Sequence, residues 1–304
     1  MRLLCRCVLS TALAAAAPLL AQPDFDKVEV KSQKLAEGVY MLTGSGGNMG
    51  VSAGPDGVFL IDDQYAPLTA KIRAAIAAIS DKPLRFVLNT HWHGDHTGGN
   101  KNLGEAGVLI VAHDNVLKRM SADQFIAAFN SKVPASPTAA LPVVTFTDGV
   151  TFHLNGEELV ATHVPPAHTD GDALVQFKKA NVLHMGDTFF NGIYPFIDLS
   201  SGGSVDGAIA AADRGLALAD ANTKIIPGHG SVGGRAELKA FRDMLAGCRD
   251  AVAPLVNAGK TLDEVKAAKP TKAFDEKWGN GFMKPEPWVG ILYADLSQKK
   301  GASK

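Results

Sequence analysis

Six consecutive residues, His91 to His96, constrain this chain more than any other feature of its sequence. They read His-Trp-His-Gly-Asp-His and directly follow Leu84–Thr90, whose apolar residues predict a β-strand. In an extended backbone alternate side chains point the same way, so His91 and His93 can face one side together. Imidazole nitrogens and carboxylate oxygens suit zinc or iron better than calcium or magnesium. Solvated surface histidines do not explain so dense a group, so we predict a metal site at the end of this strand.

The rest of the chain alternates between strand-like and helix-like segments. Further strands are predicted at Val39–Thr43, Val58–Asp62, Val108–Ala112, Val150–Leu154, Leu159–His163, Ala173–Phe177, Val182–Met185 and Lys224–Pro227. Helices are predicted at Pro67–Ile79, from Ala112 to about Phe129, at Val205–Ala219 and over most of the last sixty residues. The segment Ser131–Pro142 holds three prolines and predicts a surface loop.

This order of segments divides the chain into two halves, each of which can form a sheet with helices on its outer face. The alternative is a single doubly wound sheet. Such a sheet needs a glycine-rich phosphate turn that opens a helix, and no helix is predicted after the glycines of Gly44–Gly50. Those glycines instead suggest a hairpin that could act as a flap.

The cluster at His91–His96 resembles the H-x-H-x-D-H signature of the metallo-β-lactamase superfamily. Three later segments resemble the other motifs of that family in the same order, namely Ala167–Asp172, Leu183–Thr188 and Pro227–Gly230. The resemblance covers roughly Val39 to Arg249. It implies an αβ/βα sandwich, an α/β fold in which two facing mixed sheets carry helices outside and the metals lie at one edge.

The resemblance also implies a role for each motif residue. Seven side chains would hold two zinc ions: His91, His93 and His168 the first, Asp95, His96 and His229 the second, and Asp187 both. Asp62, after a predicted strand, would orient one of these ligands. The four remaining histidines of the chain match no ligand motif and are predicted to be packed or on the surface: His113, His153, His163 and His184.

Such a ligand set implies hydrolysis. Two cations about 3.5–4 Å apart can share one water and lower its pKa to about 7, which makes hydroxide available to attack a carbonyl. Asp95 is the predicted catalytic residue, because its carboxylate can accept a proton and orient the nucleophile. A serine nucleophile is not predicted, since Gly-x-Ser-x-Gly does not occur.

The N-terminal segment predicts export. Arg2 and Arg6 precede an apolar run from Val8 to Ala21, which is typical of a signal peptide cleaved near Ala21. We therefore expect residues 22–304 to form one periplasmic or secreted domain with a mainly helical extension from about 250 to 304. The net charge of −1 is not basic enough for binding to nucleic acid, and no membrane attachment is expected after cleavage. The expected partner is a small-molecule substrate.

The substrate has several candidates. Export favours a β-lactam, a cyclic amide that is met outside the cytoplasm. The seven-ligand set resembles that of glyoxalase II and the lactonases, so a thioesterase or lactonase is the alternative. An iron-dependent redox enzyme and a non-catalytic zinc-binding protein complete the set.

Two regions outside the motifs have open interpretations. Tyr194 follows the third motif in an aromatic stretch, where it could donate a hydrogen bond to substrate or simply pack in the core. The region from Val252 to Lys304 is rich in apolar and aromatic residues, including Trp278, Phe282, Trp288 and Tyr293, and either packs on the core or roofs the site.

Overall fold

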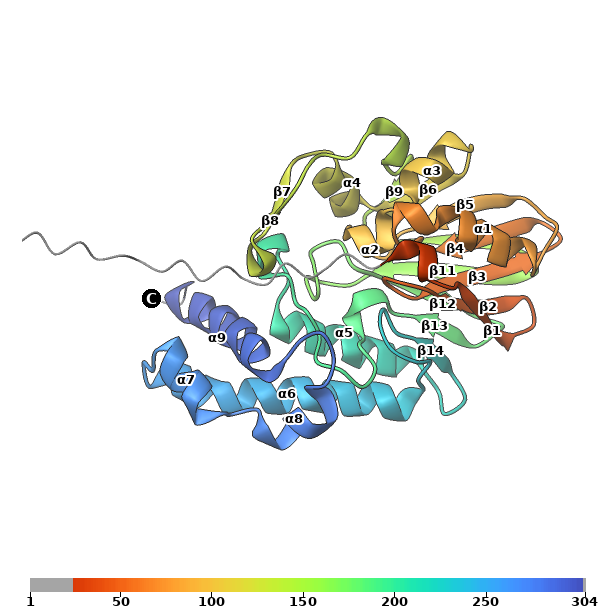
Figure 1. Cartoon of the computed structure of the whole chain (residues 1–304). Helices are drawn as coiled ribbons and strands as arrows, with labels where there is room; N and C mark the ends of the chain where they lie inside the picture. Colours follow the sequence, from red (N-terminus) through yellow and green to blue (C-terminus); the bar gives the residue numbers. More distant parts are fainter. Residues whose placement is uncertain (1–23, 303–304) are drawn as a thin grey trace, which may run out of the picture.

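The computed structural model describes residues 24–302, and its framework is two facing β-sheets with helices on their outer sides (Figure 1). Within this range the first sheet has seven strands in the order β1-β2-β3-β4-β5-β6-β9. The second has five in the order β10-β11-β12-β13-β14. Every strand of the first sheet precedes every strand of the second, as expected for two halves. The predicted αβ/βα sandwich is confirmed, and the doubly wound alternative is wrong.

The elements have the following bounds. The strands of the first sheet are β1 (Lys31–Ala36), β2 (Val39–Thr43), β3 (Met49–Gly54), β4 (Gly57–Ile61), β5 (Leu84–Leu88), β6 (Leu109–His113) and β9 (Val144–Phe146). Those of the second are β10 (Gly149–Leu154), β11 (Glu157–His163), β12 (Ala173–Phe177), β13 (Val182–His184) and β14 (Lys224–Ile226). The α-helices are α1 (Thr69–Ala77), α2 (Gly94–Thr97), α3 (Asn100–Glu105), α4 (Asp114–Met120), α5 (Val205–Leu218), α6 (Arg235–Asn257), α7 (Leu262–Ala268), α8 (Lys272–Trp278) and α9 (Pro285–Ala302).

Strand β4, inside the first sheet, is buried on both of its faces. Its residues Val58 and Leu60 join the apolar cluster that contains Ile72 of α1. The alternate residues Phe59 and Ile61 join the cluster that fills the space between the two sheets. A strand covered on both faces needs a continuous apolar run rather than an alternating one, which explains the sequence Val-Phe-Leu-Ile.

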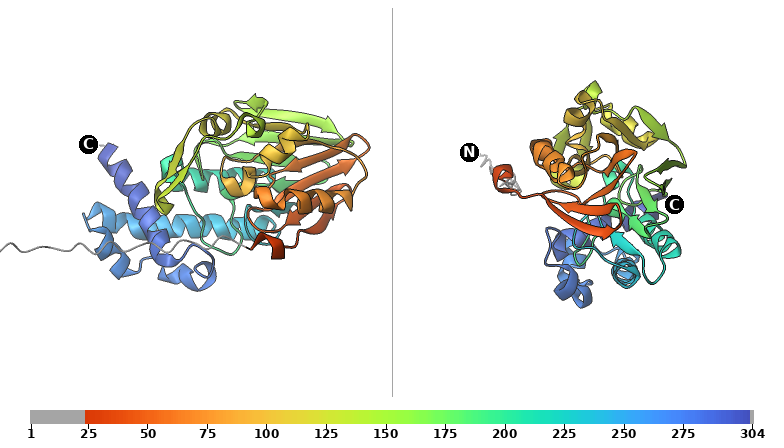
Figure 2. Two further views of the ribbon diagram at one scale, coloured as in Figure 1. Left: turned by 45° about the horizontal axis from the view of Figure 1, so that its top comes forward. Right: turned by 90° about the vertical axis from the view of Figure 1, so that its right-hand side faces the viewer.

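The outer face of the second sheet is covered by the later helices. Leu183 of β13, Leu245 of α6 and Trp288 of α9 belong to one buried cluster. The early helices and the late helices consequently lie on opposite sides of the strands, and α7, α8 and α9 gather at one end of the molecule (Figure 2). The predicted helical C-terminal region is confirmed, and it packs on the core.

One predicted helix is wrong in its length. Helix α4 ends at Met120, and the chain then forms a small antiparallel hairpin from β7 (Gln124–Ile126) and β8 (Ser131–Val133). The turn η3 (Ala127–Phe129) and Asn130, which has a positive φ of 49°, connect the two strands of this hairpin. Part of the predicted loop Ser131–Pro142 is therefore strand, and η4 (Thr138–Ala140) is a further turn within it.

The predicted signal peptide, residues 1–21, lies outside the described residues. Within residues 24–302 we find no helix that combines the length and the apolar character needed to cross a membrane.

Candidate metal centre

The seven motif side chains come from loops that follow strands. His91 and His93 lie after β5, and Asp95 and His96 lie in the short helix α2. The other three side chains come from the second half: His168 between β11 and β12, Asp187 in η5 (Gly186–Thr188) after β13, and His229 after β14. Strands β13 and β14 are parallel, so the chain leaves both at the same edge of the sheet.

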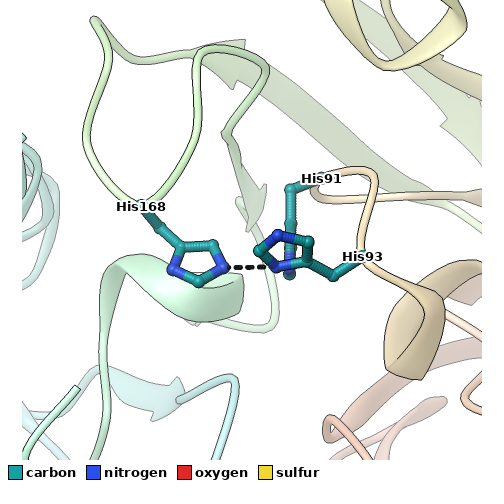
Figure 3. Close-up of side chains that lie close together, drawn as sticks. All are labelled: His91, His93 and His168. Atoms are coloured by element: carbon teal, nitrogen blue, oxygen red, sulfur yellow. Dashed lines mark hydrogen bonds between the residues drawn. The ribbon is translucent and has the colours of Figure 1, made fainter. Parts of the chain in front are cut away.

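Three imidazoles form the first group of the centre, His91, His93 and His168. One ring nitrogen from each lies within 4.8 Å of the others. His93 Nδ1 and His168 Nε2 are 2.8 Å apart and point toward each other (Figure 3). Nitrogen lone pairs that converge in this way favour a shared cation between them.

The second group combines Asp95, His96 and His229, whose donor atoms also lie within 4.8 Å of one another. His229 Nε2 is 3.3 Å from Asp95 Oδ2. The side chains of His229 and Asp95 are 22% and 23% exposed, whereas that of Asp187 is only 6% exposed. The centre is therefore open to solvent on the side of Asp95 and His229.

Asp187 lies between the two groups and turns one carboxylate oxygen toward each. Its Oδ2 is 3.5 Å from His168 Nε2 and 3.9 Å from His91 Nε2. Its Oδ1 is 3.1 Å from His96 Nε2 and 3.5 Å from His229 Nε2. A carboxylate placed in this way can bind two cations at once.

Each of four histidines has its second ring nitrogen held by an outer partner. His96 Nδ1 lies 2.7 Å from Asp62 Oδ2, which is the orienting contact that the sequence predicted for Asp62. The other three contacts are His93 Nε2 with Asp198 Oδ2 at 3.0 Å, His168 Nδ1 with the Phe196 carbonyl at 2.8 Å, and His91 Nδ1 with Thr90 Oγ1 at 3.1 Å. Such partners fix the orientation of a metal-binding imidazole.

The inward atoms provide a test of whether a metal fits. Nε2 of His91, Nε2 of His96 and Oδ1 of Asp187 are buried and make no hydrogen bond. Buried polar atoms in native proteins are nearly always paired, because an unpaired one costs about 1–3 kcal/mol. A cation requires donor atoms that are held in place by outer hydrogen bonds and have no other partner on the side of the metal. These residues therefore fit a metal.

Two glycines let the backbone approach the centre. A Cβ atom on Gly47 would lie 2.0 Å from the ring of His96, and one on Gly228 would lie 1.9 Å from Asp187 Oδ1. The loop that contains Gly47 is held by hydrogen bonds from Gly47 N to the Asp95 carbonyl and from Gln64 Nε2 to the Gly47 carbonyl. These hydrogen bonds hold the suggested flap, Gly44–Gly50, against the metal centre.

Burial and charge set the protonation of the centre. Burial lowers the pKa of His91 well below its ordinary value and that of His168 to about 4, which keeps their nitrogen lone pairs free. Burial alone would lower the pKa of His229, but the facing carboxylates, Asp187 above all, raise it to about 9. The carboxylates around the second group thus favour a positive charge there, so protons and a metal ion compete for the same donor atoms.

Sequence reasoning missed Asp198. Its carboxylate accepts hydrogen bonds from Ser200 N and Ser201 N at the start of η6 (Leu199–Ser201), and it also holds His93. The two contacting residues are 105 positions apart in the sequence. No motif spacing could have indicated the contact, because nothing in the segment after Phe196 marks this acid as different from an ordinary helix cap.

The Tyr194 side chain is not in the site. It is fully buried, and its hydroxyl donates a hydrogen bond of 2.8 Å to Asp275 Oδ1. Its ring stacks on Trp288 with centroids 5.7 Å apart. The hypothesis of a substrate contact is therefore wrong, and the packed alternative holds. The aromatic residue of this stretch that does reach the centre is Phe190, which stacks on His229 at 5.2 Å.

The four other histidines lie outside the three donor groups found in the described residues. His184 is buried, donates from Nε2 to the Asn48 carbonyl, and so joins the two sheets behind the centre. His113 and His163 stack on each other at 3.7 Å, and His153 is on the surface. Their predicted packed or surface positions are confirmed.

The Asp198 contact leads to the first prediction. We expect Asp198→Ala to weaken metal binding by about 10- to 100-fold, because His93 loses the partner that orients its ring. The measurement is competition for zinc with a chromogenic chelator. Asp213→Ala, which removes an exposed carboxylate paired with Arg242, is the matched control. Equal zinc affinity in both variants would show that Asp198 does not orient His93.

Comparisons with known proteins agree with this geometry. Residues 42–247 match the sequence profile of the Metallo-beta-lactamase superfamily. A hydroxyacylglutathione hydrolase of Nitrosococcus oceani is 32% identical over 145 residues, which are 47% of this chain and 47% of that protein. The chain spans about half the length of the curated relatives it matches.

Two solved structures share the fold at low sequence identity. A metallo-beta-lactamase from Pontibacter korlensis has a TM-score of 0.59 and 20% identity, with 72% of this chain and 99% of that chain covered. A double mutant of the sec-alkyl sulfatase PisA1 has a TM-score of 0.65 and 18% identity, with 88% of this chain and 50% of that chain covered.

Proposed function

Because the chain belongs to the metallo-β-lactamase superfamily, we propose that it is a zinc-dependent hydrolase with two zinc ions per chain. The position of Asp187 carries this proposal. Its two carboxylate oxygens face two separate groups of imidazoles, so one residue can contact both ions. A purely structural zinc site is closed by four ligands. Seven convergent donors with a solvent-exposed side therefore favour an enzyme over a non-catalytic zinc-binding protein.

The ligand assignment follows the two groups of side chains. The first ion would be held by His91, His93 and His168, the second by Asp95, His96 and His229, and both by Asp187. When bound, zinc supplies Lewis acidity toward a substrate oxygen and lowers the pKa of a coordinated water to about 7.

The chain's own residues then orient the metal ligands and accept a proton from the attacking water. Asp95 lies on the exposed side of the centre, where its second function is to accept a proton from the attacking water and orient it. Asp62 and Asp198 keep His96 and His93 in place. Phe190 is fully buried, and its ring stacks on that of His229 and supports the orientation of this imidazole. No serine or cysteine nucleophile is needed, and burial raises the pKa of the Cys248 thiol to about 12.

The substrate proposed first is a β-lactam, whose ring amide would be opened. A thioester or a lactone is the second candidate, and two observations favour it. The second group has an aspartate and histidines but no cysteine. This donor set resembles that of glyoxalase II and the lactonases, which hydrolyse thioesters and lactones. Four of the curated relatives are hydroxyacylglutathione hydrolases, at 29–32% identity.

A panel assay tests the proposal and separates the candidates. The chain from Gln22 onward is purified, its bound metal is measured, and a chromogenic cephalosporin, a thioester and a lactone are assayed side by side. We expect two zinc ions per chain and turnover of at least one of the three, abolished by a chelator and restored by zinc. Bound zinc without turnover of any substrate would overturn the hydrolase and revive the zinc-binding protein.

We also propose that residues 1–21 direct export and that residues 22–304 form one domain, periplasmic or secreted, that acts on a small molecule. N-terminal sequencing of the protein recovered from the periplasm of an expressing bacterium should begin at Gln22. An uncleaved N-terminus in the cytoplasmic fraction would contradict the export.

A further inference from the structure

A cavity of about 480 Å³ lies between the tip of the β7–β8 hairpin, the turn η6 and helix α9. The hairpin tip is the short helix η3 (Ala127–Phe129). The cavity has the volume of a small-molecule site, for which about 300–1,000 Å³ is usual. Its walls are mainly apolar and include Phe129, Ile197, Met283 and Ile291.

The cavity adjoins the first metal group directly through Asp198 and indirectly through Phe129 and Phe196. Asp198 lines the cavity and also holds Nε2 of His93. Phe129 lines the cavity and packs on Phe196 with ring centroids 4.7 Å apart. Phe196 in turn stacks on His93 at 5.9 Å with 26° between the ring planes. A ligand in the cavity is therefore separated from a metal-binding imidazole by a single side chain.

Two exposed aromatic residues lie near the centre, Phe129 against Phe196 beside the first group and Phe282 beside His229 of the second. Phe129 is 44% exposed, and Phe282 is 48% exposed. The ring of Phe282 lies 6.2 Å from that of His229, and the next residue, Met283, lines the cavity. Phe129 is the exposed apolar side chain that lines the cavity itself, and an exposed apolar wall of this kind is typical of a binding surface. Phe282 and Met283 are consecutive in the chain, so the loop before α9 contacts both His229 and the cavity.

The charge of the cavity walls disfavours a ligand with a negatively charged substituent. No lysine or arginine is among its described lining residues. The one charged group, Asp198, already accepts hydrogen bonds from Ser200, from Ser201 and from His93. A ligand with several carboxylates would find no cation here, whereas an apolar chain would bury its surface at a gain of about 25 cal/mol per Å².

We propose that this cavity is an acyl pocket that binds the uncharged apolar arm of the substrate, an alkyl or aryl-alkyl acyl group attached to the hydrolysed carbonyl. The proposal rests on the proposed function and adds the substrate class to it. It places substrate selectivity in the hairpin tip and in helix α9.

Gly290 allows a clean test. It lies on α9 and lines the cavity, and a Cβ atom added there meets no heavy atom within 4 Å. Gly290→Leu should therefore fill the cavity without a backbone clash, and removing a glycine from a helix favours folding. Gly301→Leu is the matched control, since Gly301 lies on the same helix, is exposed, has equally open space and does not line the cavity.

The experiment measures kcat/KM of the wild type and of both variants on acetyl, butyryl and octanoyl thioesters. We expect the wild type to prefer the octanoyl substrate, and Gly290→Leu to lower its kcat/KM by about tenfold while acetyl turnover changes less than about twofold. Titration calorimetry with octanamide gives a readout that needs no turnover. Gly290→Leu should weaken its binding about tenfold, with Gly301→Leu like wild type.

The outcomes separate the two proposals. Turnover without chain-length preference, together with no octanamide binding, would overturn the acyl pocket and leave the hydrolase standing. Octanamide binding that Gly290→Leu removes, without turnover of any thioester, β-lactam or lactone, would support the pocket and overturn the hydrolase. Equal losses in Gly290→Leu and Gly301→Leu would overturn the pocket, because the effect would then belong to the helix.

Discussion

Asp187→Ala should lower kcat/KM on the preferred substrate by at least about 10³-fold and reduce bound zinc from two ions per chain to one or fewer. The side chain is the one whose two oxygens face both imidazole groups. If two ions are bound as proposed, its removal would leave each of them one ligand short. The measurement pairs metal analysis with steady-state kinetics on the same samples.

The control for this prediction is again Asp213→Ala, which deletes the same carboxylate at an exposed position. Asp187→Asn tests the bridging geometry more finely, because it keeps one oxygen and replaces the other by an amide. We expect it to lose one zinc ion and most of its activity. Two zinc ions and near-normal turnover in Asp187→Ala would contradict the assigned role of Asp187.

Trp288→Ala should lower the free energy of unfolding by about 3–5 kcal/mol, the usual cost of deleting a large aromatic side chain from a core. Trp288 is fully buried on α9, in one cluster with residues of α5 and α6. Its ring stacks on Tyr194, whose hydroxyl is tied to Asp275 of α8. The deletion thus leaves a cavity at the junction of the C-terminal helices with the second sheet.

Chemical denaturation measures this effect, with Phe125→Ala as the control because Phe125 is exposed on the β7–β8 hairpin. We expect the control to change stability by less than about 1 kcal/mol. A single cooperative transition in wild type would support the proposal that the C-terminal helices and the sandwich form one domain. A separate early transition that only Trp288→Ala shifts would show that the extension folds independently.

The sequence predicted the framework well where a strong pattern had one physical meaning. A short, continuous apolar run such as Val58–Ile61 fits a strand covered on both faces, and the structure confirms this. The residues from His91 to His96 are consecutive, so the convergence of their side chains follows from local backbone geometry. Asp62 could be found because the resemblance to the family implies an orienting role for the acid after this strand.

The sequence failed where the decisive contacts join distant segments. The link from Asp198 to His93 spans 105 residues. Tyr194 lies close to Asp187 in the sequence, yet its ring points into the core against Trp288, 94 positions later. The apolar residues after Ala112 suggested one long helix, whereas the chain leaves the helix at Met120 and pairs β7 with β8 in a hairpin. Each of these outcomes depends on tertiary packing that no local pattern encodes.

The same limit explains why family membership does not settle the substrate. The family match covers residues 42–247, which contain every proposed ligand. Three residues that line the acyl pocket from α9 and the loop before it, Met283, Gly290 and Ile291, lie beyond this range. Substrate class therefore depends on a part of the chain that the shared motifs do not describe.

The most direct test of the two-metal centre is anomalous X-ray diffraction at the zinc edge from crystals of the protein as purified. The account predicts two peaks about 3.5–4 Å apart, one among His91, His93 and His168 and the other among Asp95, His96 and His229, with Asp187 in contact with both. A single peak with four protein ligands, or no zinc among these residues, would contradict it.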